Sequence, residues 1–396
     1  MHLTVQGSPG YHRDGGHSCN NFLLDPVALT EALLAFDTTN PPGQERLCAL
    51  YVADILQSGG LSVTVDEFAV GRANVIAYLP GIEAGAPFVL TGHLDTVPIG
   101  ANHWASNPIG AVKRDCKIYG RGASDMKSGV AAIVTAALEI AANHRIRNGL
   151  AVIFTAGEEV GCAGARSLVD RGLHPPRASA LLVAEPTSNQ PAVGHKGALY
   201  MNARTSGVAA HSSMPGLGVN AVYRAARAIA KIEGYAFSEK HDLFGSPTIN
   251  VGMVSGGMNV NSVPDSAAFT MDVRSVPGQT HRKVLNQLRE YLGSEVDIEP
   301  FVDMPSVATD PTHDFVNLVL EVMAKIESKP TGIGVLPFFT DASVLQPALQ
   351  CPTVILGPGE PSMAHQTDEF CYVDKIRTAA EAMVQIACSW DRHIAT

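Results

Sequence analysis

A histidine and an aspartate two residues apart follow a short apolar run in VLTGHLDTVP, residues 89–98. Histidine nitrogens are common ligands of divalent metals, and a carboxylate often accepts the other ring N–H and fixes the tautomer. His93 is therefore a candidate metal ligand, with Asp95 as the carboxylate that orients its ring. Taken alone, the pair is more simply explained as a polar turn at the end of a buried strand.

Four further polar segments each lie beside an apolar strand or a helix start. They carry Asp125 in GRGASDMKSG, Glu158 and Glu159 in AGEEVG, Glu185 in AEPT and His365 in AHQTDE. Asp125 could instead cap a helix, and the two adjacent glutamates could form a solvated turn. However, adjacent carboxylates repel each other unless a cation is near, and open α/β sheets place their sites at strand ends. Together, two histidines and three carboxylates predict a site for zinc, cobalt or manganese.

The segments between these motifs predict an α/β domain. Apolar strands are expected at 87–92, 151–156 and 180–185, and helices at 128–142 and 163–171. Continuously apolar strands that alternate with helices are typical of a mostly parallel sheet with helices on both faces.

The pattern changes after residue 190. Half-exposed strands and two helices follow in the order β-α-β-β-α-β, which is typical of a ferredoxin-like α+β domain. We therefore predict a catalytic domain formed by residues 1–190 and 304–396, with a loose extension over about residues 1–24. A lid or dimerisation domain at 191–303 interrupts it.

The overall composition disfavours several classes of protein. The 396 residues carry 28 basic and 38 acidic side chains, a formal net charge of −10, and no basic block, which argues against binding to nucleic acid. No uncharged apolar run of about 18 residues suggests a membrane span. Seven scattered cysteines without CxxC spacing fit neither a disulfide framework nor a cysteine zinc site. We expect a cytoplasmic protein.

The motifs GHLDTVP, GRGASDMKSG, AGEEVG, AEPT and AHQTDE occur in an order that resembles one family of dinuclear zinc hydrolases. This family includes acetylornithine deacetylase, succinyl-diaminopimelate desuccinylase, aminoacylase and glutamate carboxypeptidase, and the resemblance extends from about residue 25 to the C-terminus. It implies two divalent ions, zinc first, with cobalt or manganese as alternatives. One ion would be held by His93 and Glu185, the other by Glu159 and His365, with Asp125 between them.

The same resemblance implies further catalytic groups. Glu158 would be the general base for a water held between the two metals, and Asp95 would support the metal site. His211 would reach into the partner subunit's active site and stabilise the oxyanion, which implies a homodimer formed through the inserted domain. Hinge closure is implied near residues 188–192 and 303–306.

On the substrate side, the resemblance assigns Asn261 and Arg274 to a substrate carboxylate, which a guanidinium matches in bidentate geometry. Lys196 would add a second positive charge, and Thr340 would lie in a substrate-proximal loop. We therefore expect hydrolysis of the amide bond of an N-acyl amino acid. A carboxypeptidase or dipeptidase of the same family is the alternative. A non-catalytic metal-binding relative is disfavoured, because a scaffold has no need of Glu158.

Overall fold

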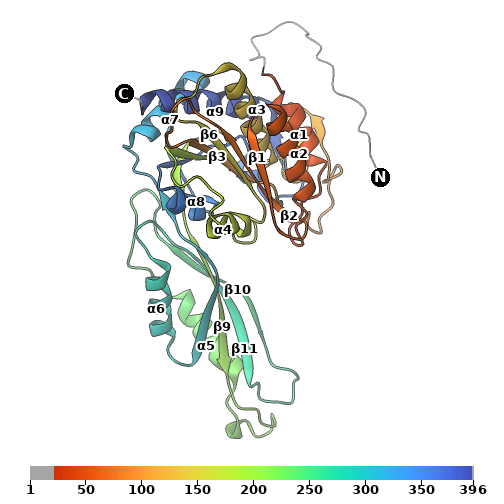
Figure 1. Cartoon of the computed structure of the whole chain (residues 1–396). Helices are drawn as coiled ribbons and strands as arrows, with labels where there is room; N and C mark the ends of the chain where they lie inside the picture. The colour runs from red at the N-terminus through yellow and green to blue at the C-terminus, as the bar shows by residue number, and fades with distance from the viewer. Residues whose placement is uncertain (1–21, 395–396) are drawn as a thin grey trace.

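The computed structural model describes residues 22–394, so the predicted extension lies outside the described residues as far as residue 21. Figure 1 shows a broad domain, in which helices cover a large sheet, and a narrower domain that projects from it. Both ends of the described chain belong to the broad domain. None of the described helices combines the length and hydropathy needed to cross a membrane.

The broad domain is built on a sheet of nine strands. Eight follow one another in the order β1 (Ser62–Ala69), β2 (Arg72–Leu79), β6 (Leu150–Thr155), β3 (Phe88–His93), β7 (Ala180–Val183), β15 (Thr353–Ile355), β8 (Ala192–His195) and β13 (Val307–Ala308), and β14 (Gly334–Leu336) pairs with β8. The central strands β6, β3, β7 and β15 are parallel to one another, whereas β1–β2, β2–β6 and β8–β13 are antiparallel. The predicted parallel sheet is thus confirmed at its centre, and the outer pairings are antiparallel except for β14 with β8.

Helices cover both faces of this sheet, as predicted (Figure 1). Successive side chains of a strand point to opposite faces. In β6, Val152 and Phe154 accordingly belong to one core, while Ala151 and Ile153 belong to the other. The first core is covered by α1 (Pro26–Leu34), α2 (Arg46–Ser58), α3 (Lys127–Asn143), α7 (Asp314–Glu327) and α9 (Val373–His393). The second is covered by α4 (Ala163–Asp170) and α8 (Ala342–Leu349).

Helix α3 is buried on nearly all sides, as expected from its apolar sequence. Gly129 lies in its first turn, where an added Cβ would come within 2.3 Å of the Ala184 carbonyl oxygen. Glycine therefore lets the beginning of α3 approach the chain directly after β7. This close contact brings the residue that precedes α3 to the carboxyl end of the sheet.

The projecting domain has the predicted β-α-β-β-α-β order. Its elements are β9 (Ala198–Ser206), α5 (Ala221–Glu233), β10 (Thr248–Gly256), β11 (Ser266–Arg274), α6 (His281–Leu292) and β12 (Val296–Met304). The four strands form an antiparallel sheet in the order β10-β11-β9-β12, and α5 and α6 pack on it around a third core. β10 is therefore an edge strand.

The two crossovers between the domains are short. Because β8 pairs with β15, it belongs to the large sheet, and the first crossover lies at residues 196–197 rather than at 188–192. The second lies at residues 305–306, between β12 and β13, within the expected range. Gly197 and Ser275 exchange main-chain hydrogen bonds of 3.0 and 3.2 Å, which tie the start of β9 to the residue after β11.

A small third sheet brings the C-terminal part of the chain to the loop ahead of α3. In it, β16 (Phe370–Tyr372) pairs with β5 (Lys117–Tyr119), and β5 pairs with β4 (Val112–Arg114). These strands have three residues each and show no periodicity, so the sequence analysis did not predict them.

Phe315 of α7 joins the large sheet to the C-terminal helix. Its buried ring contacts Phe88 and Trp390, with ring centroids 5.8 and 5.1 Å apart. We expect Phe315→Ala to lower the free energy of unfolding by about 3–5 kcal/mol, because the truncation leaves a cavity. Urea-induced unfolding measures this, with exposed Leu47 as the Leu47→Ala control. Equal stability of the two variants would contradict this packing.

Candidate active site

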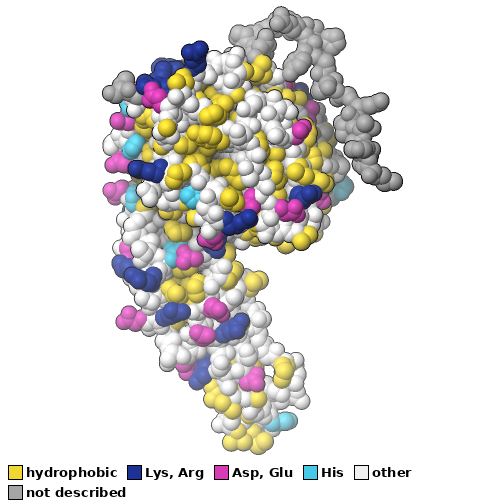
Figure 2. Space-filling view, in the orientation of Figure 1, with side chains coloured by type: hydrophobic (Ala, Val, Ile, Leu, Met, Phe, Trp, Pro, Cys, Tyr) yellow, Lys and Arg dark blue, Asp and Glu magenta, His cyan; other side chains and the backbone are white. Residues whose placement is uncertain are grey.

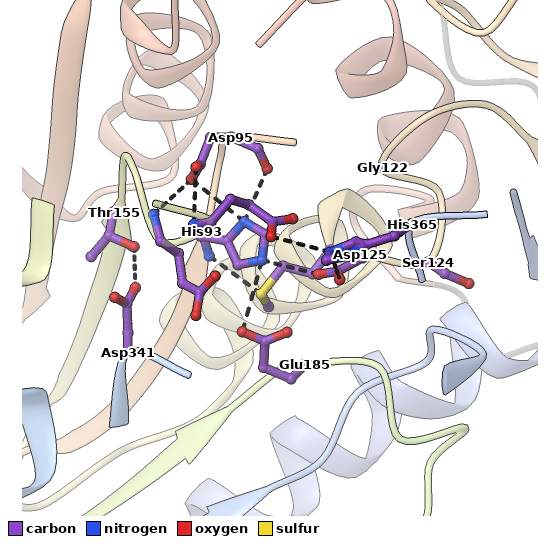
Figure 3. A network of polar contacts seen from close by, with 12 residues as sticks. His93, Asp95, Gly122, Ser124, Asp125, Thr155, Glu185, Asp341 and His365 are labelled. Atoms are coloured by element: carbon purple, nitrogen blue, oxygen red, sulfur yellow. Dashed lines mark hydrogen bonds and ion pairs between the residues drawn. The ribbon is translucent and has the colours of Figure 1, made fainter. Parts of the chain in front are cut away.

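The polar motifs meet at one edge of the large sheet. The four central strands are parallel neighbours, so their carboxyl ends lie together. His93 ends β3, Glu158 and Glu159 follow β6, Glu185 follows β7, and His365 lies in the loop after β15. Asp125 comes from the residue before the N-cap of α3, and Figure 3 shows its carboxylate between the two histidines.

Asp125 is shared by two groups of three ligand atoms. One group joins it to His93 and Glu185, the other to Glu159 and His365, and the atoms of each group lie within 4.8 Å of one another. His93 Nε2 lies 3.0 Å from Asp125 Oδ1 and 3.8 Å from Glu185 Oε1. His365 Nε2 lies 3.4 Å from Asp125 Oδ2 and 3.1 Å from Glu159 Oε2. Each oxygen of Asp125 thus faces one histidine.

Both groups fit a divalent cation. Imidazole nitrogen and carboxylate oxygen are ligands that zinc, cobalt and manganese accept. Glu159 Oε1 is buried, and no hydrogen bond among the described residues satisfies it. Burying an oxygen without a partner is unfavourable, and coordination to a bound cation would offset that cost.

The electrostatics of the site also favour cations. Burial raises the pKa of Glu158 and of Glu185 well above the ordinary value, and neighbouring carboxylates raise it further. Burial also opposes ionisation of Asp125, but hydrogen bonds from His365 and His93 hold its pKa below the usual range. Hydrogen bonds to two carboxylates raise the pKa of His365 to about 10. A buried cluster this acidic needs positive charge, which protonated histidines or divalent metals can supply.

The Asp95 carboxylate fixes the turn that carries the two glutamates. Its Oδ1 accepts hydrogen bonds from the main-chain N–H groups of Gly157 at 2.8 Å and Glu158 at 3.1 Å. Its Oδ2 accepts from Glu159 N at 3.3 Å and from Asn40 Nδ2 at 2.8 Å. Two neighbouring side chains are thereby held in place, so that both reach the site.

The hydrogen-bond acceptor of the His93 ring differs from the expectation. His93 Nδ1 lies 2.9 Å from the main-chain oxygen of Asp95 but 3.6 Å from its carboxylate Oδ1. A carbonyl oxygen can only accept, so Nδ1 carries the proton and Nε2 is left as the ligand atom. Asp95 therefore orients the ring through its main chain and the glutamate turn through its side chain.

A cavity of about 350 Å³ opens beside the two ligand groups. Both domains line it, because Tyr200 and Arg274 reach it from the small sheet. The lining from the large domain includes two phenylalanines and several polar groups, namely Phe338, Phe339, Pro361, Ala364, Asp125, Glu158, Glu159, Glu185 and His365.

Arg274 supplies a cation on the small-domain side of the cavity. Its Nη2 donates to the Tyr200 hydroxyl at 2.8 Å, and its Nε lies 2.9 Å from Asp272 Oδ1. Tyr200 and Asp272 are register partners on β9 and β11, so two strands hold the guanidinium. Among the described residues no hydrogen bond uses Nη1, which leaves this nitrogen for an anionic ligand.

His211 and Asn261 do not reach this cavity. The nine residues of β9 lead away from the crossover, so its far end lies on the order of 30 Å from there. The loop with His211 follows that end, and Asn261 lies in the adjacent loop, whose main-chain oxygen accepts from Ser212 N at 3.0 Å. Both side chains are exposed. The loops that carry them lie at the end of the small domain remote from the large sheet (Figure 1).

Lys196 and Thr340 do not line the cavity either. Lys196 Nζ donates to the Ser246 carbonyl at 2.7 Å. Thr340 is fully buried, and its hydroxyl accepts a hydrogen bond from Ala342 N at 3.1 Å at the start of α8. The loop before α8 does line the cavity, but through Phe338 and Phe339, the two phenylalanines that precede Thr340.

A buried glutamate that was not predicted from the sequence lies behind Asp125. Glu369 accepts hydrogen bonds from the main-chain N–H groups of Gly122, Ser124 and Asp125 at 3.0, 2.7 and 2.9 Å. The Arg121 guanidinium donates a fourth bond at 2.6 Å. These bonds fix the loop that presents Asp125. In the sequence Glu369 was visible as the last residue of AHQTDE, but nothing there linked it to a segment more than 240 residues away.

Two histidine–carboxylate groups that share one aspartate lie at the edge of an α/β sheet, opposite a cation from the small domain. This arrangement fits a metal-dependent hydrolase. Comparison with known proteins gives the family. Residues 89–389 match peptidase family M20/M25/M40. The acetylornithine deacetylase of Vibrio parahaemolyticus is 32% identical over 384 residues, which cover 92% of this chain and 97% of the relative.

Solved structures share the fold. A metallo-carboxypeptidase of the M20 family from Sulfolobus solfataricus matches with a TM-score of 0.78 and 19% identity, over 93% of this chain and all of the other. A dinuclear metal-binding M20 peptidase from Bacillus subtilis matches with a TM-score of 0.71 and 17% identity, over 92% and 96%. The chain belongs to peptidase family M20/M25/M40, a metal-dependent family, and is a hydrolase that acts on C–N bonds.

Glu369 should control metal retention through Asp125. Glu369→Gln removes the charge that faces Arg121 and turns an amide NH₂ toward main-chain donors, so the loop with Asp125 is expected to shift. We expect the affinity for zinc to fall by about 10–100-fold. Competition with a chromogenic chelator measures it, and thermal unfolding of the metal-free protein reports any general loss of stability.

Glu360→Gln is the matched control. Glu360 lies in the same loop, and its carboxylate accepts from Ser188 Oγ at 3.0 Å rather than from the loop with Asp125. If both variants bound zinc as tightly as the unmodified protein, Glu369 would have no positioning role.

Proposed function

We propose that this hydrolase cleaves the amide bond of an N-acyl amino acid and releases a carboxylate and the free amino acid. One observation carries the proposal: a single cavity joins the acidic and imidazole groups around Asp125 to the Arg274 guanidinium. An N-acyl amino acid carries its scissile amide and its carboxylate on the same α-carbon, so one cavity can hold both groups. The 32% identity to an acetylornithine deacetylase over most of the chain supports the same reaction type.

We assign one metal site to His93 and Glu185 and the other to Glu159 and His365, with Asp125 common to both. Zinc is the proposed ion, with cobalt or manganese as alternatives, because all three accept nitrogen and oxygen ligands. When bound, two such cations would supply Lewis acidity at the attacking water and at the amide carbonyl.

Glu158 is proposed to move the proton. It belongs to neither ligand group, yet it lines the cavity, and its main chain is fixed by Asp95. In hydrolysis the C–N bond breaks and a C–O bond forms, so one proton must pass from water to the departing nitrogen. A buried carboxylate within reach of both atoms can accept that proton and deliver it.

Arg274 is proposed to bind the substrate carboxylate. A guanidinium matches a carboxylate in geometry and charge, and this one is already oriented by Asp272 and Tyr200. If Arg274 holds the substrate carboxylate, the scissile amide would lie next to the proposed metal ligands. Binding would then orient the reacting bond.

A carboxypeptidase or dipeptidase reaction is the alternative, since Arg274 could equally bind a C-terminal carboxylate. It is supported by the fold shared with an M20 carboxypeptidase. The size of the cavity favours the deacylase, because about 350 Å³ is near the lower end of the range for small-molecule sites. A small acyl group fits such a space better than a peptide chain.

We further propose a homodimer formed through the small domain. His211 lies too far from the cavity of its own chain, so a role in stabilising the oxyanion requires a second copy. The surface supports pairing: β10 is an edge strand with Met253 and Val254 exposed. Figure 2 shows hydrophobic side chains at the free end of the small domain, and Leu217 and Val260 are among the exposed residues of the loops there.

Glu158→Gln is expected to lower kcat by about 10²–10⁴-fold while two equivalents of metal stay bound, because the amide keeps the shape but cannot take the proton. Steady-state rates with an N-acetyl amino acid and metal analysis of the same sample measure both. The control is Glu321→Gln, an exposed glutamate on α7. An unchanged kcat would refute the assignment of the base.

Subunit mixing tests the role of His211 in the dimer. His211→Ala and Glu158→Gln proteins should each be nearly inactive as homodimers. In a mixed dimer, one site combines an intact Glu158 with an intact His211 from the other chain. Random exchange at equal concentrations should therefore restore about one quarter of the unmodified activity, because half of the dimers are mixed and each has one complete site. No recovery despite exchange shown by differently tagged subunits would refute action between subunits.

A further inference from the structure

The substrate cavity has an apolar wall that the proposed chemistry does not use. Phe338 and Phe339 line it from the loop before α8, and Tyr200 lines it from β9. All three rings also pack against the second core of the large domain, so the wall is held in place rather than free to move aside. Pro361 and Ala364 extend the apolar lining on the side of His365.

The acids of the cavity are already assigned to other tasks. Asp125, Glu159 and Glu185 belong to the two ligand groups, and Glu158 is the proposed base. These are the acidic side chains among the described lining residues. None of them is left to pair with a cationic group on the substrate.

Two acids just outside the lining are engaged as well. Asp272 is paired with Arg274, with 2.9 Å between Oδ1 and Nε. Glu360, the neighbour of Pro361, accepts a hydrogen bond from Ser188 Oγ at 3.0 Å. A substrate ammonium in this space would therefore lose hydration, meet the like charge of Arg274 and find no free carboxylate among the lining residues, with only weak attraction to the aromatic faces as compensation.

We propose that the enzyme selects N-acyl amino acids whose side chain is apolar, and that Phe338 and Phe339 form the wall that recognises it. This inference rests on the proposed amide hydrolysis and refines its substrate class. The proposed preference differs from that of an enzyme specific for acetylornithine, because the ornithine side chain ends in an ammonium group. Aliphatic and aromatic side chains gain from burial against these rings, whereas a terminal charge does not.

A matched substrate pair isolates the terminal charge. N-acetyl-L-norleucine and N-acetyl-L-ornithine have side chains of nearly equal length that end in a methyl group and an ammonium group. With the zinc-loaded full-length protein, we expect kcat/KM for the norleucine derivative to exceed that for the ornithine derivative by about tenfold or more. Calorimetric titration of zinc-loaded Glu158→Gln with both compounds gives the same comparison as binding, without turnover.

The wall is tested by the double variant Phe338→Ala with Phe339→Ala. It should lower kcat/KM for the norleucine derivative by about tenfold and change that for the ornithine derivative much less. Phe68→Ala is the matched control, because Phe68 is a half-buried phenylalanine on β1 outside the cavity lining. An equal loss for both substrates would overturn the assignment of the wall. The comparison in the unmodified protein does not depend on how well the variants fold.

The outcomes separate the inference from the proposed function. Hydrolysis of the ornithine derivative at an equal or higher kcat/KM would overturn the apolar preference and leave amide hydrolysis intact. If neither compound, nor N-acetyl-phenylalanine or a dipeptide, were hydrolysed by protein with two bound metals, the proposed function would fall, and this inference with it.

Discussion

The structure depends on one electrostatic constraint: four carboxylates, those of Asp125, Glu158, Glu159 and Glu185, lie close together and largely out of water. In such a place like charges repel strongly, and each loses the hydration that would stabilise it. The two histidines offset part of this cost, and Asp125 between them is the carboxylate whose pKa is held low. A fold that maintains this cluster must resist its separation, and the surrounding architecture does so.

That resistance comes from long-range connections. Three parallel strands deliver ligands to one edge of the sheet, while the Asp95 carboxylate ties down the glutamate turn through three main-chain N–H groups. The Glu369 carboxylate accepts hydrogen bonds from three further main-chain N–H groups, in the loop that carries Asp125. An ion pair with Arg121 balances its charge. Negative side chains in the supporting layer thus bind main-chain donors rather than facing the acids directly. Asp95 and Glu369 thus hold together segments that are far apart in the sequence, and their own charges are balanced by these hydrogen-bond donors.

Features that depend on one continuous segment could be predicted from the sequence, whereas features that depend on contacts between distant segments could not. Hydrophobic periodicity predicted the parallel centre, the buried helix α3 and the order of the small domain, because those patterns reflect burial along one segment. The residue types of the site were also visible. Short strands such as β8 and β16 were not, because they exist through pairing with distant partners. Likewise, spacing alone could not show that His93 bonds to the main chain of Asp95, or that Thr340 turns inward to cap α8.

The small domain places two of the proposed functional residues at opposite ends of one sheet. Arg274 lies beside the crossovers, where it shares a cavity with the candidate metal ligands, whereas His211 lies at the far end. Beside the crossovers, His281 Nδ1 lies 2.6 Å from Asp303 and its Nε2 2.7 Å from Ser275 Oγ, and Arg166 of α4 donates to the Asp303 carbonyl at 3.1 Å. Of these contacts, the Arg166 bond joins the large domain to the end of β12, and the two His281 contacts hold Asp303 and Ser275 together on the small-domain side. Any closure over a substrate must be taken up at residues 196–197 and 305–306, since the chain on either side is paired into sheets.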